Sequence, residues 1–530
     1  MWRLRRLLWV LGAIGLLGPV GGGAGQAVYD VRDYGANPNG QRRCTEAIQK
    51  AIDACAADGG GTVYLSPGTF LSGTLTFRSD VTLRLAAGCT LLGSTDLRDY
   101  PVTVPKYRSY TDNYTDKSLI YAENVERVAI TGRGVIDGQG TAFKGPYKVR
   151  PYLMRFIECR DVMVEGVTIR NSPMWVQHYL ACDDVRISGI TVKSHVNHNN
   201  DGIDIDSCRR VVITGCNIDS GDDAIVLKST SARVCRDVTV SGCLLRSTCN
   251  ALKMGTESNG GFRNIVFTGC AIHNTRLAGV ALETVDGGTI DRVVVSDITM
   301  DGVGAPIFIR LGNRARPFKD QMEKPGIGSL RNVTIANIEA CGANVTGCAI
   351  AGLPQARIEN VTLDNVRLSF DGGGAEADAA REIPEHPANY PEYSMFGRLP
   401  AYGLYCRHIT GLTMRNVQLQ LAKQDRRSAV VFDDVAHAMV DQLDASAPSS
   451  GGALVRLKDA TGVLVRGCRP EVGTDLFLGV EGAQSKAIML VGNDLAGAEK
   501  VYETGAGVAE TAVFEMMNRF DGNRAKEGKQ

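Results

Sequence analysis

Short stretches of alternating apolar and polar residues recur along most of the chain. Residues 211–216, 238–243 and 265–270 each alternate β-branched or aromatic residues with polar ones and end in Gly-Cys, at a constant interval of 27 residues. Related stretches occur at residues 185–190, 293–298, 333–338, 361–366 and 463–468. Repeats of this length, with short strands and almost no helical periodicity, are typical of a solenoid in which each copy forms one coil. We therefore predict an all-β parallel β-helix over residues 28–502.

The repeat also predicts which residues lie above one another. Equivalent residues on successive coils of a parallel β-helix stack about 4.8 Å apart. Cys216, Cys243 and Cys270 would form one such column, most simply of small apolar side chains that point inward. A disulfide between neighbouring coils is the alternative, since its Cα separation of about 4.4–6.8 Å brackets that spacing. The total of fifteen cysteines is odd.

Three segments depart from the strand repeat. Near the start, Ile48, Ala51, Ile52 and Cys55 form the apolar stripe of a short helix that Thr45 can cap, and we expect this helix to cover the first coil. Residues 371–400 form a long loop insertion that projects from the solenoid, either as decoration or as a lid or binding wall. Residues 503–530 lose the strand pattern and are predicted to be a C-terminal tail.

The first 27 residues have the pattern of a signal peptide. Arg3, Arg5 and Arg6 precede an apolar run over residues 7–17, and small residues follow at the cleavage positions. A buried N-terminal helix is the alternative. We expect a secreted or periplasmic protein with no membrane anchor after cleavage. The chain has 58 Lys and Arg against 58 Asp and Glu, so a basic field for nucleic acid is not expected.

The tightest alignment of the repeats brings charged residues onto one face. Residues 201–207, 223–229 and 250–256 align as one strand on three coils, and residues 279–283 and 306–310 continue it. Alternation places Ile203, Ile225 and Leu252 inward, so the positions between them face outward. The outward set is Asp204, Asp206, Lys228, Lys253, Glu283 and Arg310.

Three acids are predicted to meet at the entry of this strand. Asp201 and Asp223 would stand one above the other, beside Asp222. Neighbouring carboxylates couple their titrations, and one pKa rises. Glycosidic bond cleavage requires one carboxylic acid to protonate the leaving oxygen and one carboxylate to activate water. Turn-forming aspartates and a bound cation are the alternatives.

Several motifs resemble those of glycoside hydrolase family 28, the polygalacturonase family. They are Tyr-Gly-Ala at 34–36, Gly-Gly-Gly-Thr-Val at 59–63, Asn-Ser-Pro-Met-Trp at 171–175, Asn-Asn-Asp-Gly at 199–202 and Gly-Asp-Asp-Ala at 221–224. The resemblance implies a right-handed parallel β-helix. We expect no metal and no cofactor. The resemblance also implies that Asp222 is the general acid, that Asp201 and Asp223 hold and deprotonate the attacking water with inversion, and that Asn199 orients the site.

Two family motifs are missing. Cys249-Asn250-Ala251 stands where the family carries Gly-His-Gly, and Ala281-Leu282-Glu283 stands where it carries Arg-Ile-Lys. In the family, the cationic residues of these two motifs hold a galacturonate carboxylate. Glu283, in place of a cation, would repel that carboxylate. Either Lys228 or Lys253 holds an acidic sugar at a shifted subsite, or Lys228, Glu283 and Arg310 neutralise one another. A neutral sugar such as rhamnose, or a branched pectin fragment, would suit Glu283 better.

An aromatic residue, two histidines and a glutamate also lie near the acids in the sequence. Trp175 either stacks on a sugar ring or belongs to the core. His195 and His198 are interpreted as polar turn residues rather than zinc ligands, and Glu257 as a residue lining the groove. The predicted substrate-binding residues are Asn199, Lys228, Asn250, Lys253, Glu283, Arg310 and Trp175.

The sequence therefore predicts an exported, monomeric, inverting glycoside hydrolase. Its substrate would be a pectic polysaccharide or oligosaccharide of galacturonate or rhamnogalacturonan type. Two alternatives remain. One is a polysaccharide lyase that holds calcium with the three aspartates and uses Lys253 as its base. The other is a glycan-binding β-helix without catalytic activity.

Overall fold

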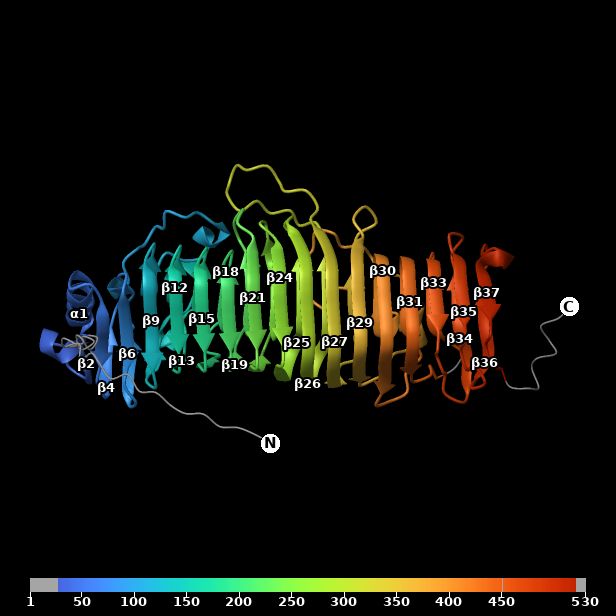
Figure 1. The fold of residues 1–530 in the computed structure, drawn as a ribbon, viewed down its shortest axis with the longest axis horizontal. Coiled ribbons are helices and arrows are strands. Elements are labelled where there is room, and N and C mark those ends of the chain that lie inside the picture. Colours follow the sequence, from blue (N-terminus) through green and yellow to red (C-terminus); the bar gives the residue numbers. More distant parts are fainter. Residues whose placement is uncertain (1–26, 450, 521–530) are drawn as a thin grey trace, which may run out of the picture.

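The chain forms an elongated solenoid of parallel strands (Figure 1). The structure is a computed structural model that describes residues 27–449 and 451–520. Val211 pairs in parallel with Val238, and Val238 with Ile265, so the 27-residue interval is one coil. These pairings confirm the predicted parallel β-helix. The predicted signal peptide lies, except for its last residue, outside the described part of the chain.

Each coil contributes strands to up to three sides of the solenoid. The first side consists of β1 (Val28–Asp30), β3 (Gly61–Leu65), β6 (Val81–Leu85), β9 (Glu126–Gly132), β12 (Arg160–Glu165), β15 (Asp183–Ser188), β18 (Arg209–Thr214), β21 (Cys235–Ser241), β24 (Phe262–Thr268), β33 (Thr461–Arg466), β35 (Lys486–Val491) and β37 (Val513–Met516). The second side consists of β2 (Asn39–Arg43), β4 (Gly68–Ser72), β7 (Cys89–Gly93), β10 (Val135–Asp137), β13 (Thr168–Arg170), β16 (Thr191–Ser194), β19 (Asn217–Ser220) and β22 (Leu244–Ser247).

The third side carries the outward charged residues predicted from the sequence. It consists of β5 (Leu75–Thr76), β8 (Ser118–Glu123), β11 (Tyr152–Ile157), β14 (Gln177–Leu180), β17 (Ile203–Asp206), β20 (Ile225–Ser229), β23 (Leu252–Ser258), β28 (Cys348–Ala351), β32 (Ala453–Lys458), β34 (Thr474–Glu481) and β36 (Ala498–Thr504). Six longer strands continue around corners: β25 (Ala271–Thr284), β26 (Thr289–Leu311), β27 (Ser329–Ala343), β29 (Ile358–Phe370), β30 (Ala401–Leu421) and β31 (Ser428–Ala445).

A continuous apolar core fills the interior of the coils. On the third side, Ile203, Ile225 and Leu252 pair in register on successive coils and are fully buried. Full burial of each such side chain contributes about 1.5–3 kcal/mol relative to exposure. The inward positions predicted by alternation are therefore confirmed, and the opposite positions of the same strands point away from the core.

All fifteen cysteines are free. Thirteen are buried, Cys249 is half-buried and Cys341 is exposed. Cys216, Cys243 and Cys270 are each at most 2% exposed, so the predicted inward column is present. It is a ladder of thiols, and the alternative of a disulfide between coils is not realised.

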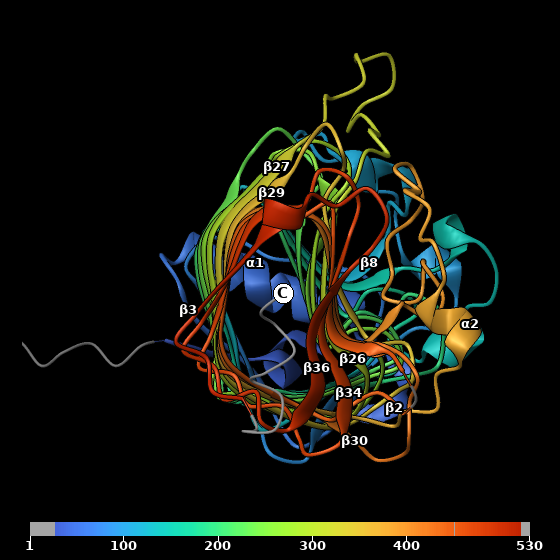
Figure 2. The same cartoon turned by 90° about the vertical axis from the view of Figure 1, so that its right-hand side faces the viewer.

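Helix α1 (Thr45–Ala57) covers the N-terminal end of the solenoid, as predicted (Figure 2). Its buried face includes Ile48, Ala51, Ile52 and Cys55 and contacts β1, β3 and β6. The predicted cap at Thr45 is wrong. Thr45 is the first helical residue, and its hydroxyl oxygen instead accepts a hydrogen bond from the backbone N–H of Gly73 at 2.8 Å.

The C-terminal strand boundary was predicted too early. Strand β36 ends at Thr504, and β37 pairs with β35 through Val513 and Ile488. Most residues of these last two strands are exposed. Their sequence therefore lacks a clear alternation of buried apolar and exposed polar residues. The solenoid therefore extends past residue 502. No helix in residues 27–449 and 451–520 is long and apolar enough to cross a membrane.

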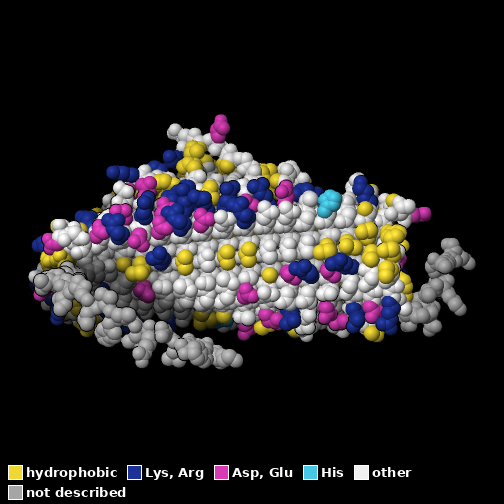
Figure 3. Space-filling view, in the orientation of Figure 1, with side chains coloured by type: hydrophobic (Ala, Val, Ile, Leu, Met, Phe, Trp, Pro, Cys, Tyr) yellow, Lys and Arg dark blue, Asp and Glu magenta, His cyan; other side chains and the backbone are white. Residues whose placement is uncertain are grey.

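The first and third sides differ in what covers them. Figure 3 looks onto the first side, where charged side chains form a band at the surface; ion pairs there include Arg210 Nε with Asp184 Oδ1 of the preceding coil at 2.7 Å. The third side lies on the right in Figure 2, beneath connecting segments and α2 (Glu376–Ala379). Exposed ion pairs such as this one contribute little to stability. The candidate functional residues lie on the covered third side.

The insertion at residues 371–400 packs against the third side and does not project as the sequence suggested. Ile383, Phe396 and Leu399 are at most 6% exposed and share an apolar cluster with Ala281 and Phe308. Apolar residues within the insertion therefore fix it to the strands. It forms a wall over this side of the solenoid.

Candidate active site

Asp201, Asp222 and Asp223 line one pocket on the third side. Asp201 and Asp223 hold the same position on successive coils, and the backbone N–H of Gly202 donates to the carbonyl oxygen of Asp223 at 2.9 Å. The pocket has a volume of about 220 Å³. Its lining residues are Tyr110, Tyr114, Tyr147, Trp175, Asn199, Asp201, Asp222, Asp223, Lys228, Glu257, Arg316 and Tyr390.

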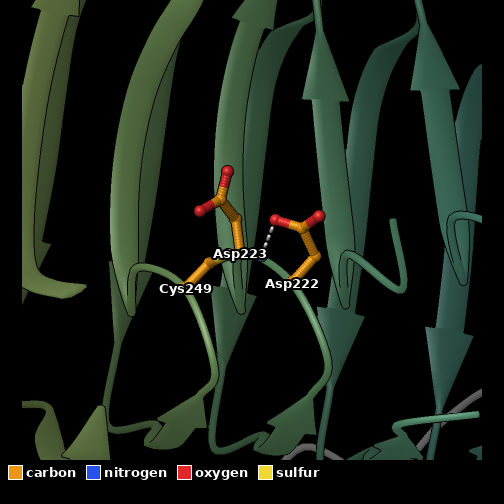
Figure 4. A group of neighbouring side chains, drawn as sticks. All are labelled: Asp222, Asp223 and Cys249. Carbon is orange, nitrogen blue, oxygen red and sulfur yellow. Dashed lines mark hydrogen bonds between the residues drawn. The ribbon is translucent and has the colours of Figure 1, made fainter. Parts of the chain in front are cut away.

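Asp222 is the half-buried acid of the three. Its Oδ1 accepts a hydrogen bond from the backbone N–H of Asp223 at 2.9 Å, and Figure 4 shows both carboxyl groups directed to the same side of the strands. One oxygen from each carboxyl group and Cys249 Sγ lie within 4.8 Å of one another. Burial and the negative charge of Asp223 raise the pKa of Asp222. A carboxyl group with a raised pKa is suited to donating a proton near neutral pH.

Asp223 is buried and faces three hydrogen-bond or charge partners. Its Oδ1 accepts from the backbone N–H of Asn250 at 3.2 Å and from Asn250 Nδ2 at 2.8 Å. Its Oδ2 lies 3.2 Å from Lys253 Nζ. Charge-assisted contacts of this kind fix the position of a carboxylate. Asn250 and Lys253 therefore lie behind Asp223 and hold it at the edge of the pocket.

Asp201 keeps one carboxyl oxygen free of protein partners. Its Oδ2 lies 3.5 Å from Lys228 Nζ, while Oδ1 has no hydrogen-bond partner among the residues the structure describes. Burial and the charge of Asp222 raise the pKa of Asp201. That oxygen is closed to solvent, but the Asp201 carboxyl group as a whole lines the pocket, where it can hold a water molecule beside Asp222 and Asp223.

Lys228 is the central cation of the pocket. Its Nζ lies 3.5 Å from Asp204, 3.7 Å from Glu257 and 4.6 Å from the centre of the Trp175 ring. Trp175 is 4% exposed and packs against Tyr114 and other aromatic rings. Trp175 is thus largely a core residue with one edge on the pocket. The core interpretation therefore applies to Trp175, and stacking on a sugar ring stays a prediction.

Asn199 also lines this pocket. Its Oδ1 accepts from Arg150 Nη2 at 3.0 Å, and its backbone adopts a left-handed conformation with φ of 57°. Asparagine tolerates this conformation better than most residues. His195, nearby in sequence, pairs with Asp219 through Nε2 and Oδ1 at 2.6 Å, which agrees with a polar turn residue. His195 and His198 line a separate surface depression.

Four residues predicted to bind substrate do not line the pocket. Asn250 and Lys253 support Asp223, as described above, and Glu283 is fully buried with its Oε2 at 3.7 Å from Lys253 Nζ. Arg310 is 1% exposed and donates to backbone carbonyl oxygens, including Gly352 at 2.9 Å and Glu385 at 2.6 Å. The expectation of direct substrate contact is therefore wrong for Glu283 and Arg310.

These contacts also change the electrostatic argument. Lys228 pairs with Asp201, Asp204 and Glu257 rather than with Glu283. Mutual neutralisation of Lys228, Glu283 and Arg310 is therefore not realised. The Glu283 carboxylate is buried, and Lys253 lies next to it. Glu283 is therefore not expected to repel an acidic sugar.

Segments outside the strand repeat supply much of the pocket wall. Tyr110, Tyr114 and Tyr147 come from connections between early strands, and Tyr390 comes from the insertion. Arg316 Nη2 donates to Glu257 Oε1 at 2.9 Å and to Asp286 Oδ2 at 3.0 Å. The four tyrosines and Arg316 were not predicted from the sequence, whereas Glu257 was. Tyrosines cluster at 107–114 and again at 390–393, and this clustering is the signal that could have found three of the four.

Comparison with known proteins gives a consistent set of likenesses. The model of a family described as "Glycosyl hydrolases family 28" matches residues 60–388. A "Probable polygalacturonase" of Vitis vinifera is 34% identical over 214 residues, which cover 37% of this chain and 43% of the relative. An "Exo-poly-alpha-D-galacturonosidase" of Dickeya chrysanthemi is 39% identical over 121 residues, covering 21% of this chain and 20% of the relative. The matches thus span less than two thirds of these relatives.

Solved structures share the fold. An exopolygalacturonase from Thermotoga maritima superposes with a TM-score of 0.61 at 24% identity, covering 74% of this chain and 92% of that protein. The family 28 exopolygalacturonase of Yersinia enterocolitica gives a TM-score of 0.63 at 19% identity, covering 79% and 78%. The strands of this chain are therefore arranged as in known β-helical proteins.

Proposed function

Because the chain belongs to glycosyl hydrolases family 28, we propose that it is an inverting glycoside hydrolase acting on a pectic polysaccharide or oligosaccharide. The observation that carries the proposal is the convergence of Asp201, Asp222 and Asp223 in one aromatic-lined pocket. Hydrolysis of a glycosidic bond needs an acid and a base on opposite sides of the reacting carbon. The pocket offers carboxyl groups for both parts, and its aromatic rings suit the apolar faces of sugars.

Each acid has a distinct part in the proposed reaction. Asp222, whose pKa is raised, gives its proton to the glycosidic oxygen as the bond to the anomeric carbon breaks. Asp223, held by Asn250 and Lys253, takes a proton from the attacking water. The Asp201 carboxyl group, which lines the same pocket, holds that water in place. The water oxygen forms the new bond at the anomeric carbon, and the leaving sugar departs as the alcohol.

The configuration of the first product tests this mechanism. We expect the newly formed reducing end to have the anomeric configuration opposite to that of the cleaved bond. Proton NMR during the first minutes of hydrolysis, before mutarotation, measures it. Retained configuration would instead indicate that Asp223, within 4.8 Å of Asp222 through their nearest oxygens, attacks carbon directly in a double displacement, and would contradict the proposal.

The pH dependence of kcat should show the raised pKa of Asp222 as its alkaline limb. An acid must be protonated to donate, so activity persists at pH values above the ordinary carboxyl range and then falls about tenfold per pH unit above the raised pKa. Measuring kcat against pH on a pectic oligosaccharide tests this. An aryl glycoside needs less proton donation, so its alkaline limb should be shallower. An identical limb on both substrates would contradict the assignment.

Tyr390 is proposed to contribute to substrate binding from the insertion wall. Its ring lines the pocket and is 54% exposed, so a sugar can reach it. Tyr390→Ala is expected to raise KM about two- to tenfold with a smaller change in kcat, since aromatic contacts contribute about 0.5–1.5 kcal/mol. Tyr390→Phe keeps the ring and serves as the matched control. Equal effects of both substitutions on KM would show that the hydroxyl group, not the ring, matters.

The proposal extends to substrate, location and assembly. Screening homogalacturonan, rhamnogalacturonan and short pectic oligosaccharides, with identification of the products, would define the sugars on either side of the cut. The sequence of residues 1–27 supports export to a secreted or periplasmic location. We propose a monomer, which size-exclusion chromatography with light scattering would test.

The lyase alternative is less well supported by the pocket. Lys228 and Lys253 already place ammonium groups 3.5 Å from Asp201 and 3.2 Å from Asp223, where a lyase would need calcium. A lyase would lose activity in EDTA and release an unsaturated product that absorbs in the ultraviolet. A glycan-binding protein without catalysis would release no product. Hydrolysis without unsaturation, undiminished by EDTA, is the result we expect.

A further inference from the structure

A second pocket lies further along the third side, towards the C-terminus. It has a volume of about 290 Å³, and its floor comes from strands β30, β31, β32 and β34. One wall comes from residues 380–383 of the insertion. We propose that this pocket binds an acidic sugar residue of the same polysaccharide that enters the candidate active site. The identity of that polysaccharide rests on the proposed function, but the binding chemistry of the pocket does not.

The two pockets lie on the same columns of outward-facing residues. The column of Lys253 continues through Ala281, Phe308 and Ala349 to Tyr405, and then to Val431 and Arg456. The neighbouring column continues from Glu283 through Arg310, Ala351 and Arg407 to Asp433 and Lys458. Lys228, which lines the first pocket, lies one coil before Lys253, so five coil steps lead from it to Tyr405 and seven to Arg456. With about 4.8 Å between coils, the pockets are therefore about 24–34 Å apart on one face.

Two cations of the second pocket have incomplete sets of partners. Arg456 Nη1 donates to the carbonyl oxygen of Ala379 at 2.7 Å, but its buried Nε has no hydrogen-bond partner among the described residues and lies 3.9 Å from Glu481. Lys458 Nζ lies 4.0 Å from Glu382, and the Lys458 side chain is 37% exposed. A buried donor without an acceptor is unfavourable. The side chains of Arg456 and Lys458 line the pocket and are 20% and 37% exposed, so a ligand carboxylate can approach both cations.

The charge balance of this pocket is less negative than that of the candidate active site. Three cations, Arg381, Arg456 and Lys458, stand against three acids, Glu382, Asp433 and Glu481. Asp433 already accepts from the Tyr405 hydroxyl at 2.8 Å, so part of this negative charge is engaged. The candidate active site has only Lys228 and Arg316 against four carboxyl groups. Of the two pockets, the second is the better place for a uronate carboxylate.

The insertion connects the two pockets. Residues 380–383 form a wall of the second pocket, and Tyr390 forms a wall of the first. Its apolar residues Ile383 and Phe396 are anchored against strands between them. A glycan lying along the third side would therefore follow one wall from one pocket to the other. This shared wall is the reason for assigning both pockets to one polymer rather than to unrelated ligands.

Charge reversal of Lys458 tests the proposal. Digalacturonate is the probe, and isothermal titration gives the number of bound equivalents and their affinity. Lys458→Glu should abolish one equivalent of digalacturonate or weaken it about tenfold, because a charge-assisted contact becomes repulsive. Lys486→Glu, an equally large charge change at an exposed residue of β35, is the matched control and should bind as the unaltered protein does. An unchanged number of equivalents and unchanged affinity in Lys458→Glu would overturn the proposal.

Further measurements distinguish a failure of this proposal from a failure of the proposed function. On polygalacturonate, Lys458→Glu should raise KM while leaving kcat/KM for a disaccharide substrate unchanged. If the chain proves inactive on every pectic substrate, the loss of one bound equivalent still stands as the test of the second pocket. Arg456→Gln should reproduce the loss, with its unfolding midpoint checked because Arg456 also holds Ala379. Equal weakening of a neutral galactan oligosaccharide by Lys458→Glu would contradict recognition of a carboxylate.

Discussion

Replacing Asp222 by Asn is expected to lower kcat by about 10²- to 10⁴-fold on a pectic oligosaccharide, because positioned acid catalysis commonly contributes that much. The amide side chain can still accept the hydrogen bond that Asp222 Oδ1 receives from the backbone N–H of Asp223. It cannot supply a proton to the leaving oxygen. Steady-state kinetics measure the effect, and an unchanged unfolding midpoint shows that the fold is intact.

The choice of substrate and control makes this test specific. On an aryl glycoside with a good leaving group, Asp222→Asn should lose less activity, whereas Asp223→Asn should be impaired on both substrates, because water must still be activated. Asp219→Asn is the matched control: Asp219 is on the same coil, pairs with His195 and Arg246, and does not line the pocket. Near-normal turnover by Asp222→Asn would remove its assigned role.

Replacing Lys253 by Met is expected to lower the free energy of unfolding by about 3–5 kcal/mol, the usual cost of leaving buried charges without their partner. Lys253 is 1% exposed, and its Nζ lies 3.2 Å from Asp223, 3.7 Å from Glu283 and 3.7 Å from Glu392. Without the ammonium group these carboxyl groups face one another in a buried site. Chemical denaturation measures the loss, and exposed Lys500→Met is the control, expected to change stability by less than about 0.5 kcal/mol.

The pH dependence of that loss has a defined sign. Burial already raises the pKa of Glu283, and removing Lys253, which lowers it, raises it further. A carboxyl group whose pKa is higher in the folded state than in the unfolded state costs no stability below its unfolded pKa and destabilises the fold as pH rises towards its folded pKa. Lys253→Met should therefore be nearly as stable as the unaltered protein near pH 4 and much less stable near pH 8.

A second substitution checks the cause. Adding Glu283→Gln to Lys253→Met removes one of the buried carboxyl groups and should recover part of the lost stability near pH 8. A loss that does not depend on pH, and that Glu283→Gln leaves unchanged, would mean that packing of the lysine stem rather than charge is responsible.

The coil repeat explains what could be predicted from the sequence. Ile203, Ile225 and Leu252 are one coil apart, so their alternation fixed both the inward face and the strand register. The same register brought Asp201 next to Asp223 and Asp222, which are about twenty residues away in the chain. A local pattern became a tertiary prediction because in a parallel β-helix each residue contacts its own counterpart on the next coil.

The cover of the third side could not be predicted in this way. Arg310 was correctly assigned to the outward side of its strand, but its partners Glu385 and His386 belong to an insertion without any repeat. Tyr390 and Arg316 reach the pocket from similarly irregular segments. Nothing in alternation or spacing specifies where such a segment packs. Arg310 was therefore predicted to be exposed, although it faces outward and is buried beneath the insertion.

The distribution of cysteines makes the chain its own reporter of unfolding. A thiol-alkylating reagent applied to the native protein should modify Cys341, which is exposed, and more slowly Cys249, which is half-buried. The other thirteen thiols become accessible only when coils separate. The number of added alkyl groups, read by mass spectrometry after a short pulse, would thus distinguish local opening near the pocket from loss of the whole solenoid.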